Sequence, residues 1–325
     1  MKQPTFVDLF AGAGLFSHAF RSNGFRPLLS VELDPVACDS YRHNVGNHIV
    51  CGDVRKVTPT DACDVLAAGP PCQGFSTLNR HRENDCRNAL AFDVIRWVDH
   101  ASPKIVVIEN VAPFLDSPEF VSFARRLRRR SYKVDAQVVQ AADYGVPQNR
   151  RRAILIASRI GEASVPQGNS RRVRSVRDAW KGLPPDPTGE RHHESPKPSP
   201  LALARFQAIP PGGDRRSIMH EHPHLVPPSW WRVSNNVNTG VWGRMHLDHP
   251  APTIRTNFQN PSKGRYIHPI ADRVISVREG ARLQGIPDSW IFHGFRTQVT
   301  RQIGNGVPIR LGKAIARHCK KLLEF

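Results

Sequence analysis

Short apolar segments alternate with helical ones over the first 160 residues, and this alternation limits the chain to few folds. The apolar segments are rich in branched residues and lie at 6–10, 28–33, 48–51, 64–68, 104–109, 132–139 and 153–157. Helical patterns separate several of them, as at 35–44, where Pro35 begins the helix without removing an N–H that is needed. Buried strands separated by helices form parallel sheets with helices on both faces. The sequence therefore predicts an α/β fold with a doubly wound, mostly parallel sheet.

The second half of the chain has a different texture. Residues 181–200 contain six prolines and no hydrophobic periodicity, which is typical of a loop or linker. Regular patterns return at 276–284 and 308–323, two segments expected to be helices. Because one hydrophobic core rarely grows beyond about 250–300 residues, a chain of 325 residues has room for a second domain. We expect a smaller, irregular domain over 161–272.

The charge of the chain indicates a polyanionic partner. Lys and Arg number 46 against 28 Asp and Glu, a formal net charge of +18, and only ten of the 46 are lysines. Arginine binds phosphates and guanine edges through paired N–H groups, which favours nucleic acid, although genome composition also raises the share of arginine. No apolar run reaches the roughly 18 residues of a membrane span, and residues 1–10 lack a signal-peptide pattern. We therefore expect a cytoplasmic protein with no membrane partner.

A glycine-containing turn follows the first predicted strand. Asp8-Leu9-Phe10-Ala11-Gly12-Ala13-Gly14 places G-x-G between a strand and a helix, where backbone can approach a ligand. Glu32 ends the second strand, where a carboxylate can bind ribose hydroxyls, and Asp53 follows the third, near the expected adenine. Ser17 occupies the place of the third glycine in the dinucleotide fingerprint. Another adenosyl cofactor is therefore favoured over NAD, and an NAD-dependent oxidoreductase is the weakest alternative.

A cysteine lies in a stiff loop directly after a strand. In Gly69-Pro70-Pro71-Cys72-Gln73-Gly74-Phe75-Ser76, a thiolate at Cys72 can act as a nucleophile if neighbouring positive charge favours its ionisation. The alternative is a buried, inert cysteine, which suits Cys38, Cys51, Cys63 and Cys319 better. None of the six cysteines forms a C-x-x-C pair, so they are expected to be free thiols rather than zinc ligands.

Two further motifs carry charged groups to strand ends. Glu109 closes the apolar run 104–109, where burial favours the proton-carrying form of a carboxyl that a general acid needs. Gln148-Asn149-Arg150-Arg151-Arg152 precedes the last apolar run, and strand alternation places Arg150 and Arg152 on one face. A structural ion pair for Glu109 and a solvated basic edge for the arginines are the alternatives.

Together these motifs resemble those of the DNA (cytosine-5)-methyltransferases of the bacterial restriction–modification type. The resemblance rests on DLFAGAGLF, GPPCQGFS, ENV at 109–111, QNRRR, REGARLQG at 278–285 and QIGNGVP at 302–308, in this order along nearly the whole chain. It implies the S-adenosylmethionine-dependent methyltransferase fold, with 1–160 as catalytic domain, 161–272 as target-recognition domain and 273–325 returning to the catalytic domain. It also implies methyl transfer from S-adenosylmethionine to C5 of a flipped-out cytosine in duplex DNA.

The resemblance assigns roles to individual residues. Cys72 matches the nucleophile, Glu109 the acid that contacts the base, and Arg150 and Arg152 the paired arginines. The residues expected to bind S-adenosylmethionine are Phe10, Gly12, Gly14, Glu32, Asp53, Val54, Pro71, Leu90 and Asn305. Leu15 stands where many members have glycine. The residues expected to contact DNA, by motif position or because their side chains read base edges, are Gln73, Ser76, Arg232, Asn235, Arg244 and Arg255.

Partners and alternatives complete the prediction. We expect a monomer that binds double-stranded DNA, and a cognate restriction endonuclease acting on the same site is a further possible partner. No metal is expected, although His220, His222 and His224 invite that reading. The alternatives are a tRNA cytosine-5 methyltransferase and a non-catalytic DNA-binding protein that keeps the fold.

Overall fold

The computed structural model describes residues 3–71, 90–231 and 240–324. The chain divides into two compact units, and each contains segments that are distant in sequence. The first unit comprises Met1–Gly145, Arg151–Arg171 and Gly306–Phe325, and the second comprises Val146–Arg150 and Arg172–Asn305. The compact units thus differ from the predicted boundaries: residues 161–171 belong with the first unit, and the chain returns to it at Gly306 rather than at 273.

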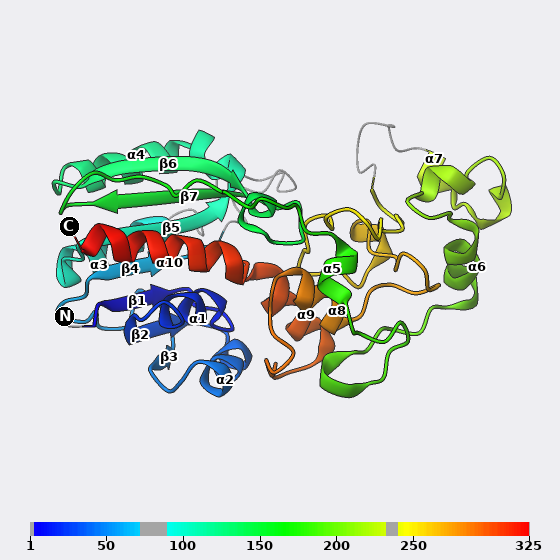
Figure 1. Ribbon diagram of the computed structural model, residues 1–325, viewed down its shortest axis with the longest axis horizontal. Coiled ribbons are helices and arrows are strands. Elements are labelled where there is room, and N and C mark those ends of the chain that lie inside the picture. The colour runs from blue at the N-terminus through cyan, green and yellow to red at the C-terminus, as the bar shows by residue number, and fades with distance from the viewer. Residues whose placement is uncertain (1–2, 72–89, 232–239, 325) are drawn as a thin grey trace. The chain divides into compact units, whose positions relative to one another are not determined.

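The first unit is built on one seven-stranded sheet with the order β3-β2-β1-β4-β5-β7-β6 (Figure 1). Its strands are β1 (Thr5–Leu9), β2 (Arg26–Glu32), β3 (Ile49–Cys51), β4 (Val65–Ala68), β5 (Ile105–Val111), β6 (Lys133–Gln140) and β7 (Arg151–Ser158). All pairings are parallel except those of β7, which runs antiparallel to both β5 and β6. The predicted doubly wound, mostly parallel α/β fold is confirmed, and each predicted strand lies within three residues of its expected bounds.

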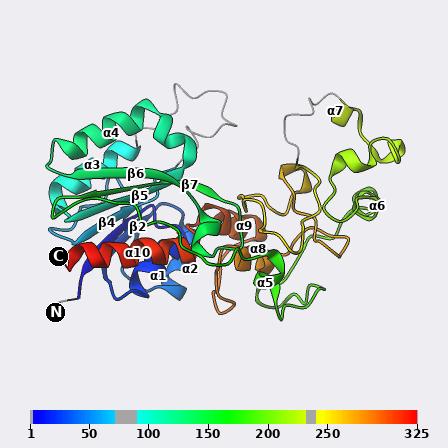
Figure 2. The ribbon, with the colours of Figure 1, turned by 45° about the horizontal axis from the view of Figure 1, so that its top comes forward.

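Helices cover both faces of this sheet (Figure 2). They are α1 (Leu15–Arg21), α2 (Pro35–Asn44), α3 (Leu90–Ala101), α4 (Pro118–Arg128) and α10 (Ile309–Leu323), with short 3-10 helices at Ala112–Asp116 and Ala141–Tyr144. One face packs α3 and α4 against the central strands through Trp97, Phe123 and Leu127. The other packs α1 and α10 through Phe20 and Ile315. Burial on both faces explains why the central strands are apolar at nearly every position.

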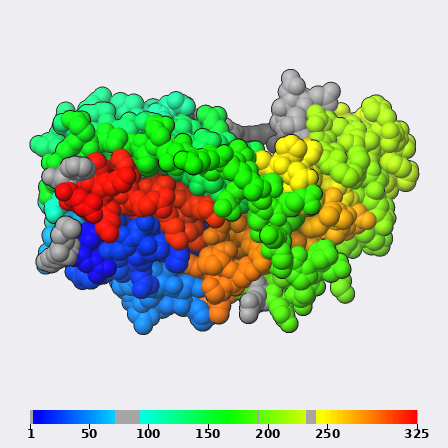
Figure 3. Space-filling view, in the orientation of Figure 1, coloured from blue at the N-terminus to red at the C-terminus, as the bar shows by residue number. Residues whose placement is uncertain are grey.

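The end of the chain completes the first unit. The helix α10 lies against α1. On the surface of this unit, the last residues of the chain (red) lie beside residues from its first segment (blue; Figure 3). Leu311 and Ile315 are fully buried in the cluster that also contains Phe6 and Phe16. The apolar period of 308–323 therefore reflects a core contact made across almost the whole length of the chain.

The second unit contains short helices joined by irregular segments. These helices are α5 (Val176–Trp180), α6 (Pro200–Ala208), α7 (Pro228–Trp231), α8 (Val277–Leu283) and α9 (Arg296–Asn305), with 3-10 helices at Glu190–His192, Arg215–Ile218, Pro223–Leu225 and Pro261–Lys263. The predicted helix at 276–284 is confirmed, with Ser276 as its N-cap.

Buried arginines hold the irregular segments of this unit together. Arg244 is 3% exposed and donates to the backbone carbonyls of Phe206, Ile209, His268 and Ala271 as well as to Asp272. Arg278 donates to the carbonyls of Pro287 and Trp290. Carbonyl groups that no sheet or helix satisfies need such donors when they are buried. The prediction that Arg244 reads DNA bases is wrong, because its guanidinium is enclosed and its donors are used.

Candidate active site

The predicted G-x-G turn has the backbone geometry that its glycines permit. Gly12 and Gly14 have φ of +55° and +92°, and Phe10 adopts φ of +60°, which is uncommon for a residue with a side chain. The turn is held by bonds from the Ala11 N–H to the Val31 carbonyl and from the Gly14 N–H to the Ala11 carbonyl, both of 3.0 Å. A Cβ atom at Gly12 would meet nothing within 4 Å. The turn therefore leaves open space beside its backbone at the carboxyl edge of the sheet.

Glu32 connects this turn to the end of β2. Its Oε2 accepts from the Gly12 N–H and its Oε1 from the Asp34 N–H, each at 2.8 Å. Burial raises the pKa of Glu32, and the backbone N–H donors partly offset this effect. The adjacent Leu33 is 68% exposed, a large apolar side chain in contact with solvent directly after the carboxylate. Leu33 is not among the residues predicted to bind the cofactor, and in the sequence only its position at the end of the second strand indicates it.

The remaining predicted cofactor residues differ in their surroundings. Asp53 follows β3 and pairs with Arg55 at 2.6 Å, and this hydrogen-bonded ion pair lowers the pKa of Asp53 to about 2. Val54 packs in the core, and its carbonyl accepts from the Trp97 indole at 3.2 Å.

The other predicted cofactor residues lie at the ends of elements. Asn305 ends α9 in the second unit and is exposed. Pro71 is partly buried beyond β4, and Leu90 begins α3. Direct contact of these residues with a cofactor stays a prediction.

A buried chain of polar groups lies beneath the turn. The Ser17 hydroxyl donates to Asp8 Oδ2 at 2.6 Å and lies 3.4 Å from the Ser30 hydroxyl, which lies 2.7 Å from the Tyr41 hydroxyl. Tyr41 in turn lies 2.7 Å from Nε2 of the half-buried His48. Burial raises the pKa of Asp8 to about 7, more than the bond from Ser17 lowers it, and the nearby Glu32 raises it further. The third-glycine position thus carries a serine whose hydroxyl satisfies a buried carboxyl.

Glu109 and Arg152 meet at the same edge of the sheet. Antiparallel pairing sets Val111 opposite Arg152, so the Arg152 side chain reaches Glu109 diagonally, with Nε and Oε1 2.8 Å apart. Their side chains are only 13% and 9% exposed. The N–H direction is not that of a hydrogen bond, and Oε1 of Glu109 is buried without a hydrogen-bond donor among the described residues. The pair therefore retains an acceptor that a ligand can use.

The loop that carries the predicted nucleophile leaves β4 next to this pair. A Cβ atom at Gly69 would lie 3.9 Å from Glu109 Oε2. The Asn110 side chain donates to the Pro70 carbonyl at 3.3 Å, which ties the start of the loop to β5. Cys72, Gln73 and Ser76 lie outside the described residues, so their roles stay predictions.

The other arginines of the QNRRR motif separate in the structure. Arg150 precedes β7, belongs to the second unit and is 1% exposed. Its guanidinium donates to the carbonyls of Ile254 and Gly304, both at 2.9 Å. Arg151 is exposed at the start of β7. The expected common face of Arg150 and Arg152 is therefore not seen, because the strand begins only at Arg151; the contacts of Arg150 are those of a residue that organises the second unit.

Besides Gln73 and Ser76, two more predicted DNA contacts fall outside the described part of the chain. These are Arg232 and Asn235. Arg255 is exposed in the second unit, with a bond of 3.5 Å to the Lys263 carbonyl. Of the predicted target-domain arginines that the structure describes, Arg255 is accessible and Arg244 is not.

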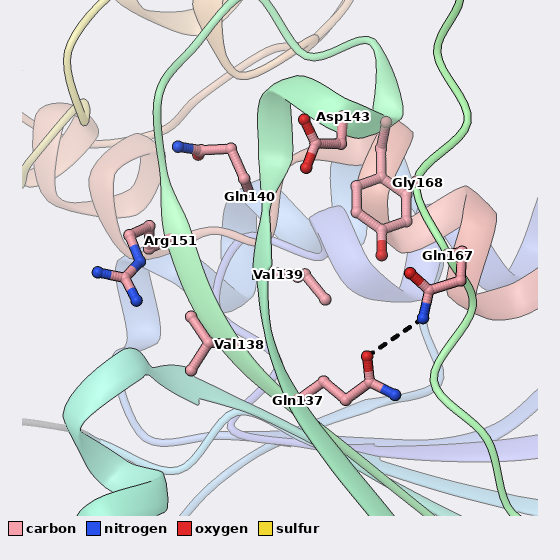
Figure 4. Close-up of a pocket in the computed structure, with 9 residues that line it drawn as sticks. Gln137, Val138, Val139, Gln140, Asp143, Arg151, Gln167 and Gly168 are labelled. Atoms are coloured by element: carbon pink, nitrogen blue, oxygen red, sulfur yellow. Dashed lines mark hydrogen bonds between the residues drawn. The ribbon is translucent and has the colours of Figure 1, made fainter.

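A hollow at the outer edge of the sheet is distinct from the Glu109 site. It has a volume of about 240 Å³ and is lined by residues of β6, the 3-10 helix Ala141–Tyr144, the start of β7 and the segment 167–168 (Figure 4). Within it, Gln167 donates to Gln137 at 3.2 Å. Neither Glu109 nor Arg152 lines it.

Within residues 3–71, 90–231 and 240–324, no three His, Cys, Asp or Glu side chains are grouped to bind a metal ion. His222 and His224 have ring centroids 6.0 Å apart, and His220 packs against Trp231. In the same part of the chain, no helix combines the length and the hydropathy needed to cross a lipid bilayer.

Comparisons with known proteins agree with this arrangement. A family model described as C-5 cytosine-specific DNA methylase matches residues 4–321. The chain is 33% identical to the type II methyltransferase M1.HphI of Haemophilus parahaemolyticus, over 98% of this chain and 87% of that protein. It is 31% identical to the type II methylase M.HgiDII of Herpetosiphon aurantiacus, over 98% and 95% respectively.

A solved structure shares the fold. The methyltransferase EhMeth of Entamoeba histolytica matches with a TM-score of 0.72 at 15% identity, covering 99% of each chain. With a family model matching nearly the whole sequence and relatives above 30% identity, the chain belongs to the C-5 cytosine-specific DNA methylases, which methylate cytosine at C5.

Proposed function

We propose that this DNA cytosine-5 methyltransferase acts through a covalent bond between Cys72 and C6 of a cytosine that is flipped out of duplex DNA, with S-adenosylmethionine as methyl donor. The relatives are named type II methyltransferases and methylases. We infer that this chain likewise modifies one specific sequence, as part of a restriction–modification pair. The observation that carries the proposal is the buried Glu109 oxygen without a donor among the described residues, beside Arg152 and the start of the Cys72 loop.

The residues at the carboxyl edge fit S-adenosylmethionine. The open backbone at Gly12 can approach the ligand, Glu32 offers carboxylate oxygens to ribose hydroxyls, and exposed Leu33 offers an apolar surface to a flat base. Ribose binding would compete with the present bonds of Glu32 to the Gly12 and Asp34 N–H groups. When bound, the donor supplies an electrophilic methyl group. Phe10, Gly14, Asp53, Val54, Pro71, Leu90 and Asn305 complete the proposed set.

The Cys72 thiolate activates the base. C5 of cytosine is a weak nucleophile, and attack of the thiolate on C6 breaks the C5–C6 double bond and places electron density on C5. C5 would then take the methyl group as the bond between that methyl group and the donor's sulfonium sulfur breaks. A proton acceptor would remove the C5 proton, and the electrons of the C5–H bond would re-form the C5–C6 double bond as the C6–S bond breaks and the Cys72 thiolate leaves. No redox change or external reductant is involved.

Glu109 and Arg152 stabilise the charge that develops on the ring. We propose that Glu109 transfers a proton to N3 as charge develops on the ring. Its Oε1 can accept from the exocyclic amino group, which gives the buried oxygen the donor that it lacks in the described part of the chain. Arg152, held 2.8 Å from Glu109, can donate to the carbonyl oxygen O2. Both groups are fixed by strands before the base arrives, so little reorganisation is needed.

Base flipping and sequence choice involve the rest of the chain. Extruding a cytosine costs a few kcal/mol, which phosphate contacts from a chain of net charge +18 can offset. We propose residues 161–272 as the target-recognition region, with Arg255 as an accessible contact. Arg232, Asn235, Gln73 and Ser76 remain proposed DNA contacts.

Duplex DNA containing 5-fluorocytosine tests the proposal, because fluorine at C5 prevents release of the covalent intermediate. With S-adenosylmethionine present, the wild-type chain should form an adduct that survives denaturation, and Cys72→Ser should not. Cys319→Ser, which changes a buried thiol elsewhere, is the control and should form the adduct. An adduct in Cys72→Ser would remove Cys72 from its role, and an adduct with tRNA but not with duplex DNA would favour the tRNA enzyme.

A further inference from the structure

The C-terminal part of α4 carries a concentration of positive charge that the methyl-transfer chemistry does not use. Residues 121–133 contain five arginines and one lysine and no acidic residue. The helix buries Phe123, Ala124 and Leu127 against the sheet, so its arginines face outward. Arg125, Arg128 and Arg129 are exposed.

Strand register brings further cations to the same place. Lys133 and Ser158 are paired across β6 and β7, and the Arg159 N–H donates to the Lys104 carbonyl at 3.1 Å. Arg159 is exposed and its guanidinium lies 5.9 Å from the Tyr132 ring centroid. The amino edge of the sheet is therefore bordered by Lys104, Lys133 and Arg159 next to the end of α4.

Only part of this charge is neutralised. Arg130 pairs with Asp99, Lys133 with Glu162, and Lys104 with Asp64. No carboxylate lies within ion-pair distance of Arg125, Arg128, Arg129 or Arg159 among the described residues. We call these four residues the α4 patch.

The arginines of the α4 patch repel one another, which offsets part of what the helix dipole gains from cations in its last turn. Arg125, Arg128 and Arg129 are spaced i, i+3 and i+4, which puts three like charges on one face, where they repel. The helix dipole favours cations in the last turn, but Arg159 arrives from the end of β7 and gains nothing from it. A bound polyanion would supply negative charge to all four residues.

The α4 patch and the Glu109 site lie at opposite ends of the strands of the sheet. Glu109 is near the carboxyl end of β5, whereas Arg159 and the end of α4 are at its amino end. Since the sheet and its helices fill the space between, a straight duplex bound at the Glu109 site cannot also reach the patch. We propose that the α4 patch binds the phosphate backbone of a second segment of duplex DNA, without sequence preference, and lets the enzyme pass between segments while searching for its site.

This inference relies on duplex DNA being the substrate, but not on the covalent mechanism. Backbone contacts release counterions, so each lost phosphate contact reduces the slope of log K against log salt by about 0.9. Helical neighbours three and four residues apart have Cβ atoms about 5–6 Å apart, and their long side chains can reach separate phosphates. Removing three patch arginines should therefore reduce the slope by about 2 to 3.

The test compares two triple variants of the full chain that lose the same charge. The patch variant is Arg125→Gln/Arg128→Gln/Arg129→Gln, and the control is Arg26→Gln/Arg317→Gln/Lys321→Gln, three exposed cations outside the patch. Binding of a fluorescent duplex of random sequence is measured between about 50 and 200 mM salt. The patch variant should show the reduced slope, and the control should keep the wild-type slope within about one contact.

Dissociation kinetics distinguish binding of a second DNA segment at the patch from a general electrostatic attraction between the protein and DNA. If a second duplex binds before the first leaves, the rate at which labelled duplex leaves the wild-type chain should rise with the concentration of unlabelled duplex. In the patch variant this rate should be independent of competitor. The rate of methyl transfer in a single turnover at saturating DNA should be unchanged, which separates failure at the patch from failure of the catalytic proposal.

Three results would overturn the inference: an unchanged salt slope in the patch variant, an equal reduction in the control, or a competitor-dependent dissociation rate that the patch variant retains. A fourth result would also overturn it. If the patch variant bound single-stranded RNA more weakly than the wild type but kept the wild-type salt slope for duplex DNA, the partner would be RNA.

Discussion

The carboxyl group of Asp8 is buried directly below the turn that is proposed to bind the methyl donor. Within the described ranges, its only hydrogen bond from a side chain is the 2.6 Å contact from Ser17, and burial raises its pKa to about 7. A carboxyl with a pKa of about 7 changes its protonation state around neutral pH. Since Ser17 lies in the first turn of α1, this bond links the carboxyl to the start of the helix that follows the glycine turn.

Replacing Asp8 with Asn should change how stability depends on pH. The unfolded chain releases the Asp8 proton near pH 4, whereas the folded chain keeps it until about pH 7. The wild-type free energy of unfolding should therefore fall between these values, by up to about 4 kcal/mol, and level off above them. Asp8→Asn removes this fall, which urea unfolding at several pH values measures. Asp61→Asn, at a fully exposed site, is the control, and parallel pH curves for wild type and Asp8→Asn would contradict the prediction.

Glu109→Gln and Arg152→Ala should slow methyl transfer without preventing DNA binding. The amide introduced by Glu109→Gln cannot transfer a proton to N3, so the single-turnover rate should fall by about 10²- to 10⁴-fold. Arg151→Ala changes the exposed neighbour and should leave the rate near wild type. Thermal unfolding of each variant identifies losses caused by misfolding. Wild-type rates in Glu109→Gln, or equal losses in Arg151→Ala and Arg152→Ala, would contradict the assignment.

At the level of elements, the direction of β7 determines the active-site pair. A parallel β7 would begin at the amino edge and carry Arg152 away from Glu109. Because β7 is antiparallel to β5, its first residues lie at the carboxyl edge beside the last residues of β5. Hydrophobic periodicity identifies a buried strand but does not give its direction, so the sequence predicted the strand and not this pairing.

The two glycines of the turn should respond differently to substitution. Gly12→Ala meets no neighbour and should lose only the roughly 1–2 kcal/mol that a left-handed backbone costs a residue with a side chain. At Gly14 the new Cβ would lie 2.6 Å from Val45 and 2.8 Å from Tyr41, which adds about 1–3 kcal/mol of overpacking. Urea unfolding measures both losses. Equal losses would show that the α1–α2 contact yields easily.

On the scale of the whole molecule, the first unit depends on both ends of the chain. Strands from the first 111 residues are covered by a helix that begins at Ile309. The unit therefore cannot complete its core until nearly the entire chain is available.

Leu311→Ala tests this closure. Leu311 is fully buried, so the substitution should reduce the free energy of unfolding of the first unit by about 2–5 kcal/mol. Val121→Ala, at a 51% exposed position on α4, should change it by less than about 0.5 kcal/mol. Chemical unfolding monitored by far-ultraviolet circular dichroism provides the comparison. A small effect at Leu311 would show that α10 packs only loosely.

The basic residues of this chain have two different surroundings, since some lie at the surface and others are buried. Arg150, Arg244 and Arg278 are buried and hold backbone carbonyls of the second unit. Composition alone does not separate these internal arginines from those at the surface. The net charge correctly predicted a nucleic-acid partner, but the prediction that Arg244 contacts DNA was wrong.

Local chemistry was sufficient for much of this protein. Apolar runs located the seven strands of the described sheet, proline marked the start of the helix at 35–44, and the ordered motifs identified the family and both Glu109 and Arg152 as candidate catalytic residues. Such features depend on neighbours in sequence, where sterics and burial act within a few residues. Tertiary structure alone decided the antiparallel course of β7, the burial of Arg150 and Arg244, the polar chain from Asp8 to His48, and the cations gathered at the amino edge. Each of these depends on which distant segments become neighbours, and a residue's own type does not reveal whether it will meet solvent, a carbonyl group or a partner.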